Sequence, residues 1–221
     1  MRALVPQLLE QVALLGAHCD DIALGAGGTL RTLCDANPEL RVTALVLTGG
    51  GTEREDEEGA ALAAFCPKAE LDLTVLDLPD GRLPAYWQAA KQAVEDMRRR
   101  CEPDLILAPA PHDDHQDHRE LARLVPTAFR DHQVLGYEIL KWDGDLAQPQ
   151  VYVPLDYEVL QEKVALLYEH YDSQRERTWF DAETFTSLAR IRGVQCHARY
   201  AEAFHVSKFV LGAGPPGVGR R

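Results

Sequence analysis

The sequence lacks the features of an exported, disulfide-bonded or membrane-spanning protein. It has five cysteines, an odd and scattered set with no C-x-x-C pair, which argues against a disulfide framework or a structural zinc knuckle. No apolar run reaches the roughly 20 residues that a membrane-spanning helix needs. The N-terminal segment shows no small-residue cleavage site followed by a polar mature start. We therefore expect a cytoplasmic protein in a reducing compartment.

Positive charge is also scarce. The 23 Lys and Arg residues face 35 Asp and Glu residues, which gives a formal net charge of -12. Such a charge repels phosphate backbones and anionic membranes. The longest basic run, Arg98–Arg100, is short and is typical of the exposed end of a helix. The sequence thus argues against nucleic acid as a partner, and it leaves open whether the chain forms a homo-oligomer.

The chain alternates short apolar runs with longer amphipathic stretches, a pattern typical of a parallel sheet flanked by helices. The predicted strands span residues 12–17, 42–48, 73–78, 104–109 and 134–139. The predicted helices span residues 28–36, 53–65, 84–100 and 118–129. The fold class is therefore α/β, a Rossmann-like three-layer arrangement with a mainly parallel sheet.

The alternation changes after residue 140. An irregular segment, 142–149, leads to a strand in VYVPLD and then to helices around 159–171 and 182–196, which we interpret as a C-terminal appendage. With 221 residues and 46% apolar composition, the chain is expected to form one domain over residues 1–212. A Gly/Pro-rich tail over residues 213–221 is expected to be flexible.

Two polar clusters directly follow predicted strands, where open parallel sheets bind their ligands. AHCDD, residues 17–21, follows the first strand, and HDDHQDH, residues 112–118, follows the fourth. Taken alone, the adjacent acids of the first cluster are explained equally well as a helix cap. Together, the clusters offer several imidazoles and carboxylates on one sheet edge, which favours an open catalytic metal site with two His ligands and one carboxylate.

Two other interpretations of the first cluster are weaker. The glycines that follow it do not fit a dinucleotide fingerprint, because Leu30 stands where the third Gly would be. Cys19 has no separate base arranged for it as a nucleophile, so we expect it to be a small buried filler.

The motifs resemble those of the PIG-L/LmbE-like zinc-dependent N-deacetylases. AHCDD is similar to the family's A-H-P-D-D turn, and HQDH is similar to its H-P-D-H. Arg54-x-x-Glu57 and the late segments SQRERTWFD, RGVQ and YAEAF extend the resemblance over nearly the whole chain. The sequence departs from the pattern at Cys19 and Gln116, which replace Pro, and at Ile22, which replaces an acidic residue.

The resemblance implies a role for each motif residue. It implies that His18, Asp21 and His118 bind Zn²⁺, or another divalent metal such as Fe²⁺, and that Asp20 is the general base. It also implies that His115 and Asp117 form a charged pair beside the metal. We expect that pairing to raise the pKa of His115 above about 6.5. Either His115 or Asp20 would then protonate the departing amine.

The residues flanking these motifs are harder to assign. Arg54 and Asp113 are predicted to contact substrate hydroxyls or phosphate, although each has an ordinary alternative as a helix cap or a surface ion pair. The resemblance implies removal of the N-acetyl group from a small molecule that contains N-acetylglucosamine, such as a free conjugate, a sugar nucleotide, a glycolipid or an antibiotic precursor. The alternatives are a metal-dependent hydrolase of another bond and a non-catalytic nucleotide-binding module.

Overall fold

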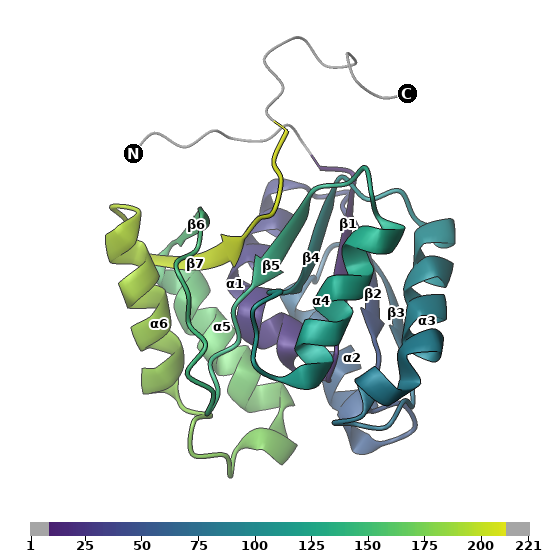
Figure 1. The fold of residues 1–221 in the computed structure, drawn as a ribbon. Coiled ribbons are helices and arrows are strands. Elements are labelled where there is room, and N and C mark those ends of the chain that lie inside the picture. Colours follow the sequence, from purple (N-terminus) through teal and green to yellow (C-terminus); the bar gives the residue numbers. More distant parts are fainter. Residues whose placement is uncertain (1–8, 211–221) are drawn as a thin grey trace.

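Seven strands form one sheet within residues 9–210, the part of the chain that the computed structural model describes (Figure 1). They are β1 (Gln11–Gly16), β2 (Arg41–Val46), β3 (Glu70–Val75), β4 (Leu105–Pro109), β5 (Val134–Tyr137), β6 (Val151–Leu155) and β7 (Tyr200–His205). Their order across the sheet is β3-β2-β1-β4-β5-β7-β6. The first five strands pair in parallel, whereas β7 is antiparallel to β5 and β6. The predicted mainly parallel α/β fold is confirmed.

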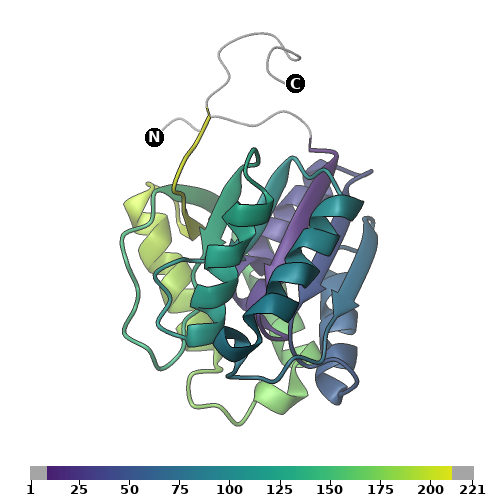
Figure 2. The same ribbon diagram turned by 45° about the vertical axis from the view of Figure 1, so that its right-hand side comes forward.

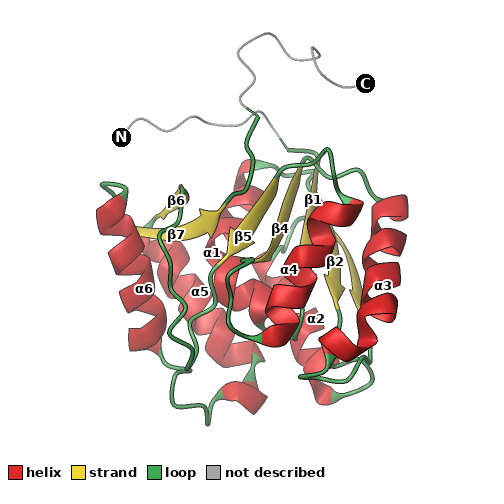
Figure 3. Cartoon of the chain, viewed as in Figure 1, coloured by secondary structure: helices red, strands yellow, loops and turns green. Residues whose placement is uncertain are grey.

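Helices cover both faces of this sheet, so the fold has three layers with the sheet in the middle (Figures 1 and 3). They are α1 (Asp21–Ala36), α2 (Glu53–Phe65), α3 (Trp87–Arg100), α4 (Gln116–Ala128), α5 (Tyr157–His170) and α6 (Ala182–Gln195), with short 3-10 turns η1 (Leu83–Tyr86) and η2 (Asp172–Gln174). Helices α3 and α4 lie in front of the sheet in Figure 2, and the other four lie behind it. None of the helices within residues 9–210 is long and apolar enough to cross a membrane.

The central strand, β1, is apolar throughout because helices cover both of its faces. Val12 and Leu14 pack in the core under α1, α2, α5 and α6, whereas Ala13 and Leu15 pack in the core under α3 and α4. Successive side chains of a strand point to opposite faces, so a strand that is covered on both faces needs apolar residues at every position. The VALL run of β1 meets this requirement.

Helix α1 begins earlier than predicted, at Asp21 and not at Gly28. Its glycines lie within the helix because they allow close packing. A Cβ atom at Gly25 would lie 2.3 Å from Cδ2 of Tyr137, and one at Gly28 would lie 2.6 Å from Cδ1 of Leu155. The GAGG stretch therefore brings α1 close to the sheet, and Asp21 becomes the first residue of the helix.

The C-terminal part extends the sheet, a feature that the sequence pattern did not predict. Strand β7 inserts between β5 and β6, and only β6 was expected as a strand. YAEAFH has apolar residues at alternate positions and also a buried Glu202, so its pattern is ambiguous. Strand β3 also begins three residues earlier than the predicted start at residue 73. The tail predicted over residues 213–221 lies outside the described residues, and the single-domain boundary stays a prediction.

The order of the strands places a switch point between β1 and β4. Strand β2 lies on one side of β1 and β4 lies on the other, so the connections that follow β1 and β4 diverge at their carboxyl ends. Open α/β sheets bind ligands in the crevice at such a point. Both polar clusters follow these two strands.

Candidate active site

The two clusters meet at the carboxyl edge of the sheet, although they are about one hundred residues apart in the chain. Nδ1 of His18 lies 3.0 Å from Nε2 of His118. The carboxylate of Asp21 lies between both rings, with Oδ1 3.1 Å from Nε2 of His118 and Oδ2 3.6 Å from Nδ1 of His18. Two imidazole nitrogens and one carboxylate therefore converge.

This donor set fits a divalent cation. In a tetrahedral zinc site with bonds of about 2.0–2.1 Å, the ligand atoms lie about 3.3 Å apart. The 3.0 Å between the two histidine nitrogens and the 3.1 Å between Oδ1 of Asp21 and Nε2 of His118 are close to this value. Each imidazole also has a carboxylate at its other nitrogen, since Asp113 lies 2.9 Å from Nδ1 of His118 and Asp117 lies 3.2 Å from Nε2 of His18. Such outer carboxylates orient the histidines of metal sites. Zinc is a suitable occupant on these grounds.

Other combinations of side chains are close enough to share a cation. One is His18 with His115 and His118, and the other is His18 with Asp80 and Asp117. Both sets contain His18, and neither contains Asp21. We favour Asp21 as the third ligand because it is an anion that contacts both His18 and His118, and because the two other acids contact only the outer nitrogen of His18.

The acids around the two histidines favour their protonated forms. Burial opposes the charged form of His118, but Asp21 and Asp113 outweigh it and raise the pKa of His118 to about 9. Burial also opposes the charged form of His18, but Asp21 outweighs it and raises the pKa of His18 well above its usual value. Burial would raise the pKa of Asp21, yet His118 and His18 lower it. A bound metal must displace these protons, which couples its affinity to pH.

Asp20 stands beside the cluster in an unusual backbone conformation. Its φ angle is 112°, a left-handed conformation that non-glycine residues seldom adopt, and it precedes the first residue of α1. Its backbone N–H donates to Oε2 of Glu58 at 2.9 Å, and its Oδ2 lies 3.0 Å from Nη2 of Arg54. Burial raises the pKa of Asp20 to about 7, although Arg54 lowers it. The value suits a general base at neutral pH.

Glu58 supports this turn and was missed in the sequence. It is fully buried, and its Oε2 also accepts a hydrogen bond from the Tyr171 hydroxyl at 2.7 Å. Its Oε1 has no hydrogen-bond partner among residues 9–210. Burial raises the pKa of Glu58 to about 8, against the effect of Tyr171. The sequence holds one signal that Glu58 is buried, which is its spacing along the helix. Glu58 lies three, four and seven residues before the buried Ala61, Leu62 and Phe65, so it is on the same face of α2.

Arg54 also holds the Asp20 turn in place. Its Nη2 donates to the carbonyl of Cys19, and its Nη1 donates to Glu57 at 2.8 Å and to the Ser173 hydroxyl at 2.7 Å. The guanidinium thus joins α2, the turn after β1 and the C-terminal part of the chain. Cys19 itself is buried, as predicted, with its thiol directed at the carbonyl of Thr48. Whether Arg54 contacts substrate stays a prediction.

Asp113 is similarly engaged by protein groups. It is buried, with Oδ2 on His118 and Oδ1 3.0 Å from Nζ of Lys141. Oδ1 also accepts the backbone N–H of His115 at 2.8 Å. Lys141 was missed because it lies in an irregular loop far from both motifs in the sequence. The substrate contact predicted for Asp113 is untested, but its contacts favour a role in orienting His118.

The expected charged pair of His115 and Asp117 is not seen. The carboxylate of Asp117 accepts the backbone N–H groups of Gly81 and Leu83 at 2.7 and 3.0 Å and lies beside His18. Its contact with His115 is through the backbone, since the Asp117 N–H donates to Nδ1 of His115 at 3.3 Å. Burial, together with the charges of His118 and His18, lowers the pKa of His115. This direction is opposite to the expected rise, and the catalytic roles of His115 and Asp117 stay predictions.

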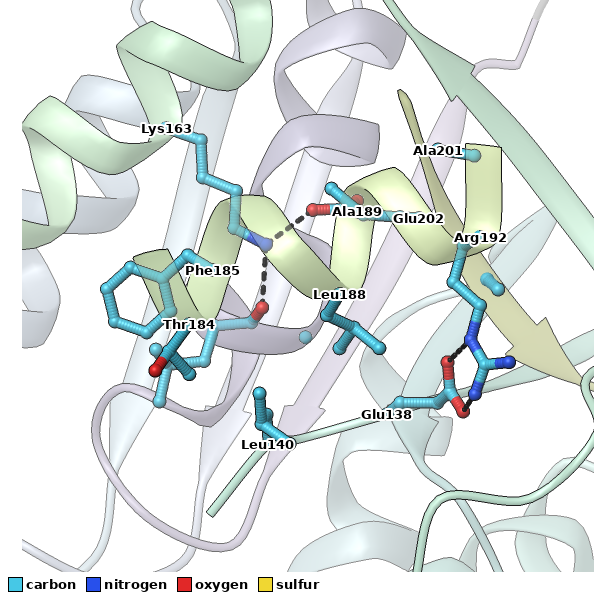
Figure 4. A pocket seen from close by; sticks show the side chains of 13 residues that line it. Glu138, Leu140, Lys163, Thr184, Phe185, Leu188, Ala189, Arg192, Ala201 and Glu202 are labelled. Carbon is cyan, nitrogen blue, oxygen red and sulfur yellow. Dashed lines mark hydrogen bonds and ion pairs between the residues drawn. The ribbon is translucent and has the colours of Figure 1, made fainter. Parts of the chain in front are cut away.

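A small neighbouring cleft is lined by residues of α1, α5, α6 and β7 and of the loop after β5 (Figure 4). Its charged side chains are paired with one another. Nζ of Lys163 lies 2.6 Å from Oε1 of Glu202, and Nη2 of Arg192 lies 2.5 Å from Oε1 of Glu138. None of the predicted site residues lines this cleft. We interpret its ion pairs as structural links between the C-terminal elements and the rest of the sheet.

The fold and site define a class: α/β proteins with a His/Asp centre of metal-binding type at the switch point of the sheet. The chain belongs to the PIG-L family, described as GlcNAc-PI de-N-acetylase, which it matches over residues 13–129. It is 30% identical over 125 residues to diacetylchitobiose deacetylase from Thermococcus kodakarensis. That match spans 50% of this chain and 46% of the relative, about half the length of each.

Solved structures share the fold over nearly the whole chain. A conserved protein from Thermus thermophilus has a TM-score of 0.72 at 23% identity, covering 92% of this chain and 97% of that one. For N,N'-diacetylchitobiose deacetylase from Pyrococcus horikoshii the TM-score is 0.68 at 19% identity, with coverage of 90% and 84%. For a 4-carboxy-2-hydroxymuconate hydratase from Pseudomonas putida it is 0.74 at 16% identity, with coverage of 93% and 99%. At these identities the likeness establishes the fold alone.

Proposed function

We propose that this chain is a zinc-dependent N-deacetylase that removes the acetyl group from a sugar containing N-acetylglucosamine, releasing acetate and an amino sugar. His18, Asp21 and His118 are the proposed metal ligands. The observation that carries the proposal is the convergence of these three side chains beside Asp20, with a further carboxylate behind each imidazole. Membership of the PIG-L family and the similarity to a diacetylchitobiose deacetylase support it.

The metal and the protein contribute different parts of the reaction. A bound zinc ion would supply Lewis acidity to the amide carbonyl and to a water molecule. The protein supplies three ligands and leaves the remaining positions to water and substrate, as catalytic sites do. Asp113 and Asp117 fix the orientation of the two histidines through their outer nitrogens.

Asp20 is proposed to act as the general base. Its carboxylate is adjacent in sequence to a proposed ligand, and Arg54 and Glu58 hold its turn in place. With a pKa of about 7, Asp20 accepts the proton of the attacking water and can later return it to the departing amine. The proposal therefore assigns both proton transfers to Asp20 and none to His115.

His115 is proposed to act as a neutral hydrogen-bond donor. Its Nδ1 accepts the backbone N–H of Asp117, so the ring proton of the neutral imidazole resides on Nε2. Burial lowers the pKa of His115, which favours the neutral ring. From this position Nε2–H would donate to the oxygen that gains negative charge when water adds to the amide. Asp117 was predicted to be catalytic. Its proposed role is instead to hold His18 and the loop around Gly81 in place.

The test is release of acetate by the metal-loaded protein. N,N'-diacetylchitobiose, N-acetylglucosamine and an N-acetylated amino acid form a minimal panel. We expect acetate from at least one of the sugars and none from the amino acid. Turnover of the amino acid alone would indicate hydrolysis of another amide. A metal-loaded protein that releases acetate from no compound would contradict the proposal and favour a non-catalytic module. The cytoplasmic location stays a prediction.

A further inference from the structure

Trp142 is both exposed and fixed in position. Its side chain is 66% exposed, yet its Nε1 donates to the Thr178 hydroxyl at 3.1 Å. The guanidinium carbon of Arg177 lies 5.7 Å from the ring centroid, and Trp179 makes an edge contact with centroids 6.3 Å apart. These three contacts orient the indole, and an aromatic ring that is oriented and exposed to solvent can stack on a ligand.

Both segments that form this surface are anchored to the candidate active site. Lys141, next to Trp142, reaches Asp113, which contacts His118. On the other segment, Ser173 accepts a hydrogen bond from Arg54, which contacts Asp20. The loop after β5 and the connection between α5 and α6 meet near the lower edge of the molecule in Figure 1, at the carboxyl end of the sheet. The indole is therefore outside the cluster of His18, Asp21 and His118, but both of its segments are connected to that cluster.

The surroundings of the indole suit a ligand with an apolar face and a polar rim. Arg177 and Asp143 are exposed beside it, and Nζ of Lys141 lies 3.6 Å from Oδ2 of Asp143. A pyranose ring presents a face of C–H groups and an edge of hydroxyl groups. The C–H face can stack on an aromatic ring while hydroxyls bond to charged neighbours. A purely aliphatic ligand would leave those polar groups without partners.

We propose that Trp142 and Arg177 form a platform for a second sugar ring, joined to the ring whose N-acetyl group is hydrolysed. The proposal rests on the proposed deacetylase function. Trp142 is exposed and follows Lys141, whose Nζ lies 3.0 Å from Oδ1 of Asp113, so the platform is separated from the reacting centre by the Lys141 side chain and Asp113. It would therefore favour substrates of two or more rings over a single N-acetylated sugar.

The platform is tested by comparing N,N'-diacetylchitobiose with N-acetylglucosamine in acetate release. In Trp142→Ala we expect KM for the disaccharide to rise about tenfold while kcat changes less, since stacking adds binding energy away from the reacting bond. KM for the single sugar should stay within about twofold of the parent value. Trp142→Phe should restore part of the disaccharide affinity. An equal rise for both sugars, or no rise for either, would overturn the proposal.

Tyr157→Ala is the matched control. The side chain of Tyr157 is 52% exposed and lies at the start of α5. The candidate site is at the other end of that helix, where Tyr171 contacts Glu58. Its removal should leave both KM values unchanged. A rise in the disaccharide KM of Tyr157→Ala equal to that of Trp142→Ala would show a general effect of losing surface aromatics and would overturn the proposal.

A binding experiment separates the platform from the proposed function. Cellobiose has two rings and no amide, so it reports binding without hydrolysis. We expect it to change the tryptophan fluorescence of the parent protein but not that of Trp142→Phe. If the parent hydrolyses no N-acetylated sugar but shows this difference, the platform stands and the deacetylase proposal fails. No fluorescence change in the parent with either disaccharide would overturn the platform.

Discussion

Asp20 has a strained backbone, a buried carboxylate and a raised pKa, and all three depend on neighbours outside its own motif. Its φ angle of 112° is maintained by a hydrogen bond to Glu58, and Arg54 contacts its carboxylate. A non-glycine residue in such a conformation costs about 1–3 kcal/mol, which the surrounding structure must offset. Strain of this kind concentrates at functional sites, in keeping with the role proposed for Asp20.

Replacing the carboxylate of Asp20 by an amide separates catalysis from metal binding. In Asp20→Asn the proposed ligands are intact, so zinc content should match that of the parent. The amide cannot accept the proton of water, so kcat should fall about 10²- to 10⁴-fold. Metal analysis and acetate release measure the two effects. Near-parental turnover would show that Asp20 only shapes the turn.

The pH dependence of activity tests the link between Asp20 and Arg54. The base must be deprotonated, so kcat/KM should rise as pH rises through the pKa of Asp20, about 7 in the metal-free chain. A metal ion adds positive charge, so the limb of the holoenzyme should lie at or below that value. Arg54 lowers the pKa of Asp20, so Arg54→Gln should move the limb to higher pH.

A substrate contact alone would give a different result for Arg54→Gln. KM would rise, and the position of the rising limb would not change.

His115 is proposed to work in its neutral form, so we expect no falling limb that Asp117→Asn shifts to lower pH. A limb that shifts in this way would restore the charged-pair interpretation.

The residues of the two motifs could be predicted from the sequence, but the residues that hold them in place could not. His18, Asp20, Asp21 and His118 were identifiable because each cluster is contiguous and follows an apolar run. The supports come from other elements: Asp80 from the loop after β3, Glu58 from α2 and Lys141 from the loop after β5. Their roles depend on packing between distant segments, which a local pattern does not encode.

At the level of elements, the predicted strands and helices follow the periodicity of apolar residues closely. Helix α2 spans the residues predicted for it, and most other ends differ by a few residues. The main error was the start of α1, which was predicted at Gly28 and lies at Asp21. Glycine lowers helix propensity, but here the close approach of α1 to β5 outweighs that cost. Strand β7 depended on pairing with β5 and β6, which its own residues do not specify.

Gly25→Ala tests that close packing. The new Cβ would lie 2.3 Å from Cδ2 of the fully buried Tyr137, whose hydroxyl bonds to the carbonyl of Leu15. We expect a loss of about 1–3 kcal/mol in the free energy of unfolding, measured in urea. Activity should also fall, because α1 carries Asp21 at its first turn.

Gly59→Ala is the control for this substitution. Gly59 is also helical, but its Cβ would have only Leu73 nearby, at 3.9 Å. Alanine is the better helix former, so this variant should gain about 0.5–1 kcal/mol. If Gly25→Ala were as stable as Gly59→Ala, close packing of α1 against β5 would not be the reason for the glycine.

For the whole molecule, the strand order explains how distant motifs become one site. Parallel strands present their carboxyl ends at the same edge, and the switch between β1 and β4 opens a crevice there. The same fold occurs in deacetylases and in a hydratase, so the chemistry depends on the side chains at this edge. The loop after β5, where Trp142 lies, and the connection between α5 and α6 contact the candidate site at this edge.

The central claim is that His18, Asp21 and His118 hold a zinc ion on which hydrolysis of an N-acetylated sugar depends. The most direct measurement is acetate release from N,N'-diacetylchitobiose by chelator-stripped protein during titration with zinc, beside the same titration of His118→Ala. We predict that stripped parent protein is inactive, that activity returns fully at one zinc per chain, and that His118→Ala regains little. Full activity in the stripped parent, or equal recovery in His118→Ala, would contradict the account.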